Sequence, residues 1–203
     1  MLLKEGAMIG IRRMDNLPNN WPAEMPNVPE DSHGWFRDHN KKVLSRFLNK
    51  DDMVIELGSW LGSSTRFIAD RCKHVIAIDH WKGGPEHHNS TWQSIKGRLP
   101  KLYETFLRNC WSRKDKITPL KMDTVEGLTE CSKAGVSPNL IYIDASHEYT
   151  DVIADLTLAA KLFPKALIIG DDWERKGVHQ AVMNYTYSKD IVLKVYGNVW
   201  WIR

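Results

Sequence analysis

Short apolar runs alternate with amphipathic stretches along most of this 203-residue chain. Runs rich in Val, Ile and Leu predict five strands, at residues 53–57, 74–79, 116–122, 140–144 and 166–170. Between them, apolar residues at helical spacing predict helices at residues 63–71, 124–133 and 149–163. Continuous apolar strands separated by helices indicate an α/β fold, a doubly wound and mostly parallel sheet with helices on both faces.

The two ends of the chain have different patterns. Residues 178–187 predict one more helix, and two strand-like runs split at Gly197 and Asn198 predict a C-terminal antiparallel hairpin, which brings the predicted sheet to seven strands. Residues 15–31 contain four prolines and predict an extended arm or lid. Ser32 is expected to cap a helix that covers the sheet. The apolar positions of that helix are Trp35, Phe36, Val43, Leu44, Phe47 and Leu48.

An insertion follows the second predicted strand. Gly83, Gly84 and Pro85 break the pattern, and a helix containing Leu102 and Phe106 comes after them. An insertion of this length above a sheet is a usual place for a substrate lid. We therefore expect residues 1–50 to form an N-terminal arm and covering helix. Residues 51–203 are expected to form one domain with a lid insertion near 80–112.

The composition narrows the class of protein. Apolar residues make up 42% and charged residues 26%, as in soluble globular domains, and a net charge of +3 does not indicate a nucleic-acid partner. No run approaches the ~20 apolar residues of a membrane span, and the first residues lack a signal-peptide core. Cys72, Cys110 and Cys131 have no metal-site or disulfide spacing. These features favour a cytoplasmic enzyme or binding protein without a membrane partner.

Acidic residues end or directly follow all five of these strands. They are Glu56, Asp79, Asp123, Asp144 and the pair Asp171 and Asp172. In an open α/β sheet the ligand lies beyond the carboxyl ends of the strands, so these acids are expected to face one crevice. A single one reads equally well as a polar strand terminus, but five strands that end in this way favour a site.

The loop after the first strand, Glu56-x-Gly58-x-x-x-Gly62, lacks the G-x-G-x-x-G spacing that admits a pyrophosphate. Asp79 is suited to accept two hydrogen bonds from a ribose diol. Together they fit an adenosine ligand without pyrophosphate, and S-adenosylmethionine is the obvious candidate. Asp123 is suited either to receive the adenine amino group or to cap the following helix. The candidate cofactor-binding residues are Glu56, Gly58, Ser59, Gly62, Ser63, Ser64, Asp79, His80, Asp123 and Asp144.

A second group of residues combines Asp144-x-x-His147 with Asp171 and Asp172. Three carboxylates brought together repel one another unless a cation lies among them. An all-oxygen set of Asp144, Asp171 and Asp172 would select a hard ion such as Mg²⁺. His147 is expected to take a proton from an acceptor hydroxyl. The alternative interpretation is that His147 caps a helix or packs against it.

Aromatic side chains of the loops allow two further interpretations. His80, His87 and His88 would suit zinc, but no cysteine is nearby and we favour no zinc site. Four tryptophans would form apolar walls of a site or belong to the core; they are Trp60, Trp81, Trp92 and Trp173.

These motifs carry a family resemblance. "VIELGSWLGSST" resembles motif I of the class I S-adenosylmethionine-dependent methyltransferases. "IAIDHW", "IYIDASHEYTDVIADL", "LIIGDDW" and "KGVHQAV" are similar to the metal-dependent sugar O-methyltransferases of the macrocin and novobiocin type, over roughly residues 50 to 185. The resemblance implies a Rossmann-like fold and methyl transfer to a hydroxyl. It also implies Mg²⁺ on Asp144, Asp171 and Asp172, with His147 or Asp144 as the base.

The sequence departs from that family in two places. The family usually has Pro-Gly-Gly before its fifth strand, where this chain has "FPKALIIGDDW". The chain is also shorter at its N-terminal arm, and in the family such regions help to build the acceptor pocket and the oligomer. The resemblance therefore leaves open which small molecule or sugar is the acceptor and whether the protein is a homo-oligomer.

Three other functions share the fold. A related branch includes the cephalosporin hydroxylase type, which has the same sheet and acidic cluster. A nucleotide-dependent oxidoreductase would need the missing G-x-G-x-x-G spacing. A non-catalytic binding protein would not need acids at the strand ends, so the acids favour an enzyme.

Overall fold

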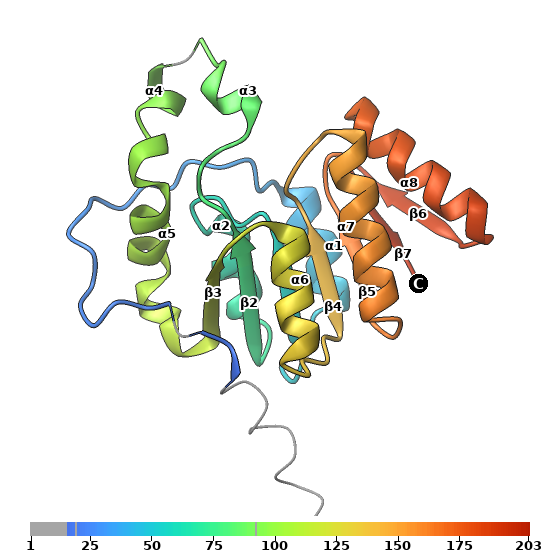
Figure 1. The fold of residues 1–203 in the computed structure, drawn as a ribbon, viewed down its shortest axis with the longest axis horizontal. Helices are drawn as coiled ribbons and strands as arrows, with labels where there is room; N and C mark the ends of the chain where they lie inside the picture. Colours follow the sequence, from blue (N-terminus) through green and yellow to red (C-terminus); the bar gives the residue numbers. More distant parts are fainter. Residues whose placement is uncertain (1–15, 19, 92) are drawn as a thin grey trace, which may run out of the picture.

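The computed structural model describes residues 16–18, 20–91 and 93–203. Its strands are β1 (Met53–Leu57), β2 (His74–Asp79), β3 (Ile117–Lys121), β4 (Leu140–Ile143), β5 (Leu167–Gly170), β6 (Leu193–Tyr196) and β7 (Val199–Ile202). They form one seven-stranded sheet in the order β3-β2-β1-β4-β5-β7-β6 (Figure 1). β1 to β5 are parallel to their neighbours in this series, and β7 is antiparallel to β5 and β6. The predicted fold class is confirmed.

Helices cover both faces of the sheet, because the central strands are apolar on both sides and must be buried on both. The helices are α1 (Asp38–Phe47), α2 (Ser63–Ala69), α3 (Pro85–His88), α4 (Gln93–Lys96), α5 (Leu102–Cys110), α6 (Thr124–Lys133), α7 (Tyr149–Leu162) and α8 (Lys176–Lys189), with 3₁₀ turns η2 (Leu99–Lys101) and η3 (Trp111–Lys116). α6, α7 and α8 share one apolar cluster with the sheet, and α1, α2 and α5 share the other (Figure 1). Among the described residues, no helix has the length and apolar character needed to cross a bilayer.

The predicted start of the first helix is wrong. α1 begins at Asp38, after an N-cap residue, Arg37, with extended backbone, and Ser32 lies outside it. The Asn40 side chain accepts a hydrogen bond of 2.9 Å from the Arg37 backbone N–H and so closes the first turn. Phe36 packs on Phe67 with ring centroids 5.2 Å apart. Phe36 is therefore apolar because it packs on Phe67 from the extended segment before α1. The helical spacing of the sequence predicts helix in that segment, which is wrong.

The proline-rich arm is irregular over its described part, as predicted, and it packs against the edge of the sheet. Asn20 Nδ2 donates to the Pro119 carbonyl at 2.9 Å, and Trp21 Nε1 donates to the Ile117 carbonyl at 2.7 Å. Tyr103 of α5 donates to the Asn20 carbonyl at 3.0 Å. These contacts hold the arm on β3 without a ligand, which differs from the expectation of a lid. The arm's Asp15 and Asn19, and Trp92 of the lid, lie outside the described residues.

The predicted lid near 80–112 divides into two parts. α3 and α4 are single turns above the carboxyl ends of the strands (Figure 1). α5 instead buries Leu102, Phe106 and Cys110 against the sheet. Only the first part of the insertion is therefore placed as a lid would be, and α5 belongs to the core.

Candidate functional site

A cleft of about 870 Å³ lies at the carboxyl ends of β1 to β5, with the lid residues Gly83, Gly84 and His87 on its wall. Most of the predicted site residues line it: Gly58, Ser59, Ser63, Ser64, Asp79, His80, Asp123, Asp144, His147, Asp171 and Asp172. Two predicted cofactor-binding residues, Glu56 and Gly62, are not among the lining residues. The convergence follows from the parallel strands, whose carboxyl ends all meet at one edge of the sheet.

Gly58 allows the loop after β1 to touch the end of β4. Its φ is 84°, and a Cβ there would lie 2.1 Å from the Asp144 carbonyl oxygen. No other residue type fits this approach without moving the backbone. The Asp144 N–H donates to the Leu57 carbonyl at 2.8 Å. Gly58 thereby places the glycine loop directly beside Asp144.

Gly62 has a packing role, and its role as a cofactor-binding residue stays a prediction. It is the N-cap residue of α2 with φ 81°. A Cβ on it would lie 2.4 Å from Cys110 Sγ and 3.2 Å from the Phe106 ring. Gly62 is therefore required for the close approach of α2 to α5.

Glu56 lies fully buried beneath the loop, and its role in cofactor binding also stays a prediction. Its Oε2 accepts hydrogen bonds from Ser59 Oγ at 2.8 Å and from Thr65 Oγ1. Burial raises the pKa of Glu56 to about 7, although the hydrogen bonds from Ser64, Thr65 and Ser59 act in the opposite direction. Glu56 thus organises the loop and the start of α2 from below.

Asp79 lines the cleft but gives most of its acceptor capacity to the protein. Oδ2 accepts from the backbone N–H groups of Ser59 (3.0 Å) and Trp60 (2.9 Å), and Oδ1 accepts from that of Trp81 (2.6 Å). A carboxylate has about four acceptor positions, so about one remains for a ribose hydroxyl rather than the expected two. Trp60 and Trp81 have positive φ, 45° and 49°, a conformation that costs roughly 1–2 kcal/mol per residue and that these bonds offset.

Asp123 is the N-cap residue of α6, but its side chain makes no capping hydrogen bond. It lines the cleft next to Thr124 and Val125. Of the two interpretations given for Asp123, the contacts favour the ligand-facing one, because the carboxylate is not used to cap the helix.

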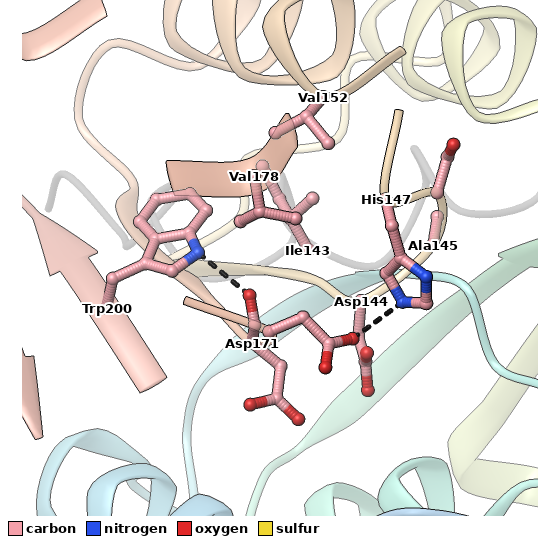
Figure 2. A pocket seen from close by; sticks show the side chains of 10 residues that line it. Ile143, Asp144, Ala145, His147, Val152, Asp171, Val178 and Trp200 are labelled. Atoms are coloured by element: carbon pink, nitrogen blue, oxygen red, sulfur yellow. Dashed lines mark hydrogen bonds and ion pairs between the residues drawn. The ribbon is translucent and has the colours of Figure 1, made fainter. Parts of the chain in front are cut away.

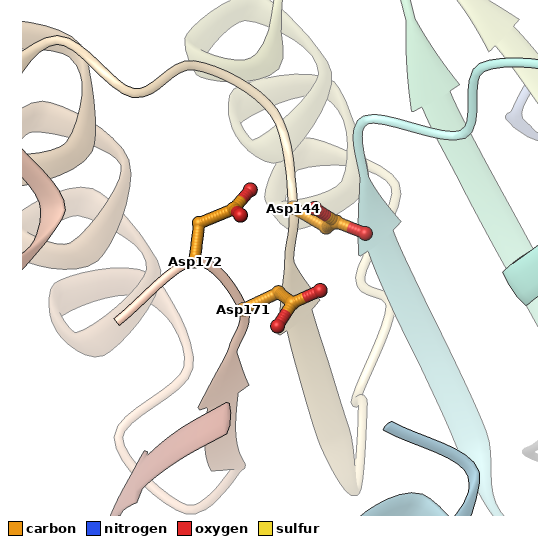
Figure 3. Close-up of side chains that lie close together, drawn as sticks. All are labelled: Asp144, Asp171 and Asp172. Carbon is orange, nitrogen blue, oxygen red and sulfur yellow. The ribbon is translucent and has the colours of Figure 1, made fainter. Parts of the chain in front are cut away.

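Three carboxylates from the ends of β4 and β5 form the acidic cluster: Asp144, Asp171 and Asp172 (Figure 3). One ligand atom from each lies within 4.8 Å of the others. Burial and the charges of Asp171 and Asp172 raise the pKa of Asp144 well above its usual range. Burial also raises the pKa of Asp171, whose Oδ1 is buried and accepts no hydrogen bond from the described residues. The cluster is therefore unfavourable as three charges and would be stabilised by a cation.

His147 reaches the cluster through Asp172, with 2.8 Å between Nε2 and Oδ2 (Figure 2). Burial alone would raise the pKa of Asp172, but the hydrogen bond and charge of His147, together with Arg175, lower it. An ionised carboxylate only accepts hydrogen bonds, so Nε2 of His147 is assigned as the donor to Asp172. Gly177 permits this arrangement, because a Cβ there would lie 2.2 Å from the His147 carbonyl oxygen.

Trp200 of β7 holds the Asp171 backbone. Its indole Nε1 donates to the Asp171 carbonyl at 3.0 Å (Figure 2). The ring lies on Gly170, where a Cβ would be 2.1 Å from Cζ2. No pattern in the sequence indicates this contact, because Trp200 has the position of an ordinary apolar strand residue.

Asn40 of α1 is a site residue that sequence reasoning missed. It is fully buried, and its Nδ2 donates to the Tyr142 hydroxyl at 3.0 Å. Tyr142 lies within 3.4 Å of Asp144 Oδ2, a long hydrogen bond. Asn40 precedes Val43 and Leu44 by three and four residues and so lies on the apolar face of α1. A polar residue on that face was the signal available in the sequence.

The aromatic residues divide between wall and core. Trp60 lines the cleft and stacks on His87, with ring centroids 4.6 Å apart and 24° between the planes, and Trp35 lies 5.6 Å from Trp60. Trp81 is buried against Phe106 and belongs to the core. Trp173 packs on His179 and is not among the residues that line the cleft. Among the described residues, the acidic cluster is the group that could hold a metal, and it includes none of the lid histidines.

Comparisons with known proteins agree with this arrangement. A search of curated proteins finds no match. The precorrin 8w decarboxylase of Methanobacterium thermoautotrophicum is 17% identical, with 93% of this chain and 96% of that chain covered and a TM-score of 0.57. The calicheamicin methyltransferase CalS11 is 13% identical, with 83% and 80% covered and a TM-score of 0.56. MycE of the mycinamycin biosynthetic pathway, in complex with Mg, SAH and mycinamycin VI, is 16% identical, with 85% and 50% covered and a TM-score of 0.54.

At these identities the structural likeness shows the fold. The family assignment comes from the sequence, where residues 55–173 match the model described as a methyltransferase domain. The match includes the glycine loop and the three carboxylates, and it confirms the prediction of a methyltransferase. Because it spans more than half of the 203 residues, the chain belongs to the methyltransferase domain family.

Proposed function

We propose that the protein transfers a methyl group from S-adenosylmethionine to a hydroxyl of a small molecule or sugar, assisted by Mg²⁺. The observation that carries this proposal is the position of the acidic cluster, which opens into the same cleft as the glycine loop. A methyltransferase without metal assistance would not need three carboxylates beside its cofactor.

The cofactor part of the proposal rests on the loop after β1. Ser59 and Ser63 line the cleft, Asp79 offers one remaining acceptor position, and Asp123 faces the same space. The loop has no pyrophosphate cradle. The family assignment, and the SAH bound in MycE, which shares the fold, support S-adenosylmethionine.

The residues of the acidic cluster fit a hard divalent cation. Their ligand atoms are all carboxylate oxygens, the set that Mg²⁺ prefers, and Asp171 Oδ1 is a buried acceptor to which no described residue donates. A bound Mg²⁺ would lower the pKa of the acceptor hydroxyl and offset its developing negative charge. The acceptor class is supported by CalS11, described as a TDP-rhamnose 3'-O-methyltransferase, and by MycE, both of the same fold.

The reaction is an in-line displacement. The acceptor oxygen forms a bond to the methyl carbon while the bond between that carbon and sulfur breaks, which leaves S-adenosylhomocysteine. The hydroxyl proton passes to His147, which Asp172 orients. Asp144 was the other candidate base. A cation held by the acidic cluster would lower the pKa of Asp144 and make it a weaker base, so we assign that role to His147.

Calorimetry with S-adenosylhomocysteine, NAD and Mg²⁺ tests the proposal. We expect the homocysteine compound to bind and NAD not to bind. Asp171→Asn and Asp172→Asn should lose cation binding and most turnover but keep cofactor binding, with Asp190→Asn, at the C-cap of α8, as the matched control. Methyl transfer that is insensitive to chelator and unchanged in Asp171→Asn and Asp172→Asn would defeat the metal assignment, and tight NAD binding would favour an oxidoreductase.

The repulsion among the three carboxylates also predicts a change in stability. In chelator, Asp144→Asn should unfold at a higher temperature than the wild type, because repulsion in the cluster is relieved.

A further inference from the structure

Asn198 makes hydrogen bonds with three consecutive residues after β5, residues 172–174. Its carbonyl accepts from the Trp173 N–H at 2.9 Å, and its Oδ1 accepts from the Glu174 N–H at 2.8 Å. Its Nδ2 donates to Asp172 Oδ1 at 3.3 Å. One residue of the C-terminal hairpin thus holds Asp172, one of the three carboxylates, and the two residues that follow it.

The hairpin turn does not itself require an asparagine at this position. Tyr196 pairs with Val199, so the turn consists of Gly197 and Asn198. Gly197 has the positive φ, 59°, which is the feature that such a two-residue turn demands of its first residue. The amide of Asn198 is therefore available for contacts outside the hairpin.

Asp172 needs an external constraint. Its φ of 58° is in the left-handed region, which turns the chain sharply at the end of β5. Its two carboxylate oxygens have different partners, Asn198 at Oδ1 and His147 at Oδ2. A carboxylate held at both oxygens cannot rotate about χ2 without losing one of these hydrogen bonds.

We propose that Asn198 is a positioning residue that sets the orientation of the Asp172 carboxylate, and through it the orientation of His147. The consequence for turnover rests on the proposed function, whereas the effect on the pair of Asp172 and His147 does not. Groups that orient first-contact ligands of a metal change its affinity by about 10–100-fold when they are removed. Asn198 is expected to act in this way from outside the acidic cluster.

Asn198→Ala is the test variant and Tyr196→Phe is its control. Tyr196 lies on the same hairpin and is exposed, and its hydroxyl accepts from Lys42 Nζ at 2.7 Å, so the control removes one hydrogen bond of the hairpin without touching residues 172–174. In metal-free protein labelled with ¹⁵N-histidine, the His147 ring signals report its hydrogen bond to Asp172. We expect them to shift in Asn198→Ala toward those of Asp172→Asn, and to stay unchanged in Tyr196→Phe.

Two further measurements complete the test. Asn198→Ala should bind Mn²⁺ at least about 10-fold more weakly than the wild type and bind S-adenosylhomocysteine within about twofold of it. Wild-type His147 signals in Asn198→Ala would overturn the positioning role, and so would a shift of the same size in Tyr196→Phe. Shifted signals in a protein whose wild type binds no divalent cation would overturn the proposed function and leave Asn198 as a positioning residue of the Asp172 and His147 pair.

Discussion

The acids at the ends of β1 and β2 both accept hydrogen bonds from groups within the protein. Glu56 holds hydroxyl groups from below the glycine loop, and Asp79 holds three of the backbone N–H groups around it. Their positions after strands were predictable, because strand ends follow from the apolar pattern. Which of them would face a ligand was not, because that depends on side-chain direction and on whether neighbouring donors already occupy the oxygens.

The buried carboxyl of Glu56 predicts a pH dependence of stability. Its pKa is raised from 4.5 to about 7, so the folded state binds this proton more tightly than the unfolded state does. The free energy of unfolding should therefore fall as pH rises from about 4.5 to 7, by roughly 3 kcal/mol from this group at most. Glu56→Gln should lack that part of the fall, measured by urea unfolding in chelator at several pH values.

Other carboxyls titrate in the same range, so the difference between variants is the informative quantity. Glu104→Gln, on the exposed side of α5, is the matched control and should keep the wild-type slope. A slope in Glu56→Gln equal to that of the wild type would mean that Glu56 is not the source.

At the scale of elements, the strands follow the sequence closely. The predicted and observed bounds of β1 and β2 agree, those of β4 and β5 differ by one residue at one end, and those of β3 differ by one residue at each end. Buried parallel strands are apolar throughout, so their pattern is hard to mistake. The predicted first helix starts too early, because Trp35 and Phe36 are apolar for reasons other than helix packing. Trp35 lies beside Trp60, and Phe36 packs against Phe67. The sequence predicts α5 as part of a lid, because an apolar helix face does not indicate which surface of the protein it will cover.

The contact between α2 and α5 gives a prediction at this scale. Gly62→Ala should lower the free energy of unfolding by about 2 kcal/mol or more, since the residue has φ 81° and its Cβ would meet Cys110 Sγ. Gly34→Ala is the control, because the nearest atom to its Cβ would be Ser63 Cβ at 3.7 Å. Denaturant unfolding of both variants checks this. Equal stability of the two would show that α2 and α5 can separate without cost.

At the scale of the molecule, the site is assembled from both ends of the chain. Parallel strands bring the acids together, and this much follows from the sequence. Asn40 from α1 and Asn198 from the hairpin reach the same acids, at sequence separations of 102 and 26 residues from their partners Tyr142 and Asp172. The sequence shows Asn40 as a polar residue on an apolar helix face. It has no local pattern that records which distant residue Asn40 or Asn198 contacts, so these contacts became visible only in the structure.

The packing of the N-terminal arm and of the lid predicts where a protease cuts the ligand-free protein. Residues 20–31 are held on β3 and α5 by side-chain hydrogen bonds, and Asp31 pairs with Arg98 at 2.6 Å. Residues 82–91 contain only the short helix α3 and line the cleft. Limited proteolysis should therefore cut first within 82–91, and S-adenosylhomocysteine with Mg²⁺ should slow that cut. First cleavage within 20–31 would show that the arm leaves the sheet edge.

The close approach of Trp200 to Gly170 has a consequence for how this protein could have diverged. A side chain at position 170 would overlap the indole, since a Cβ there would lie 2.1 Å from Cζ2. Any descendant that acquires a larger residue at position 170 must therefore first replace Trp200 with a smaller one. That replacement removes the donor to the Asp171 carbonyl. Positions 170 and 200 should consequently change together among homologues, and glycine at 170 should be retained wherever tryptophan is kept at 200.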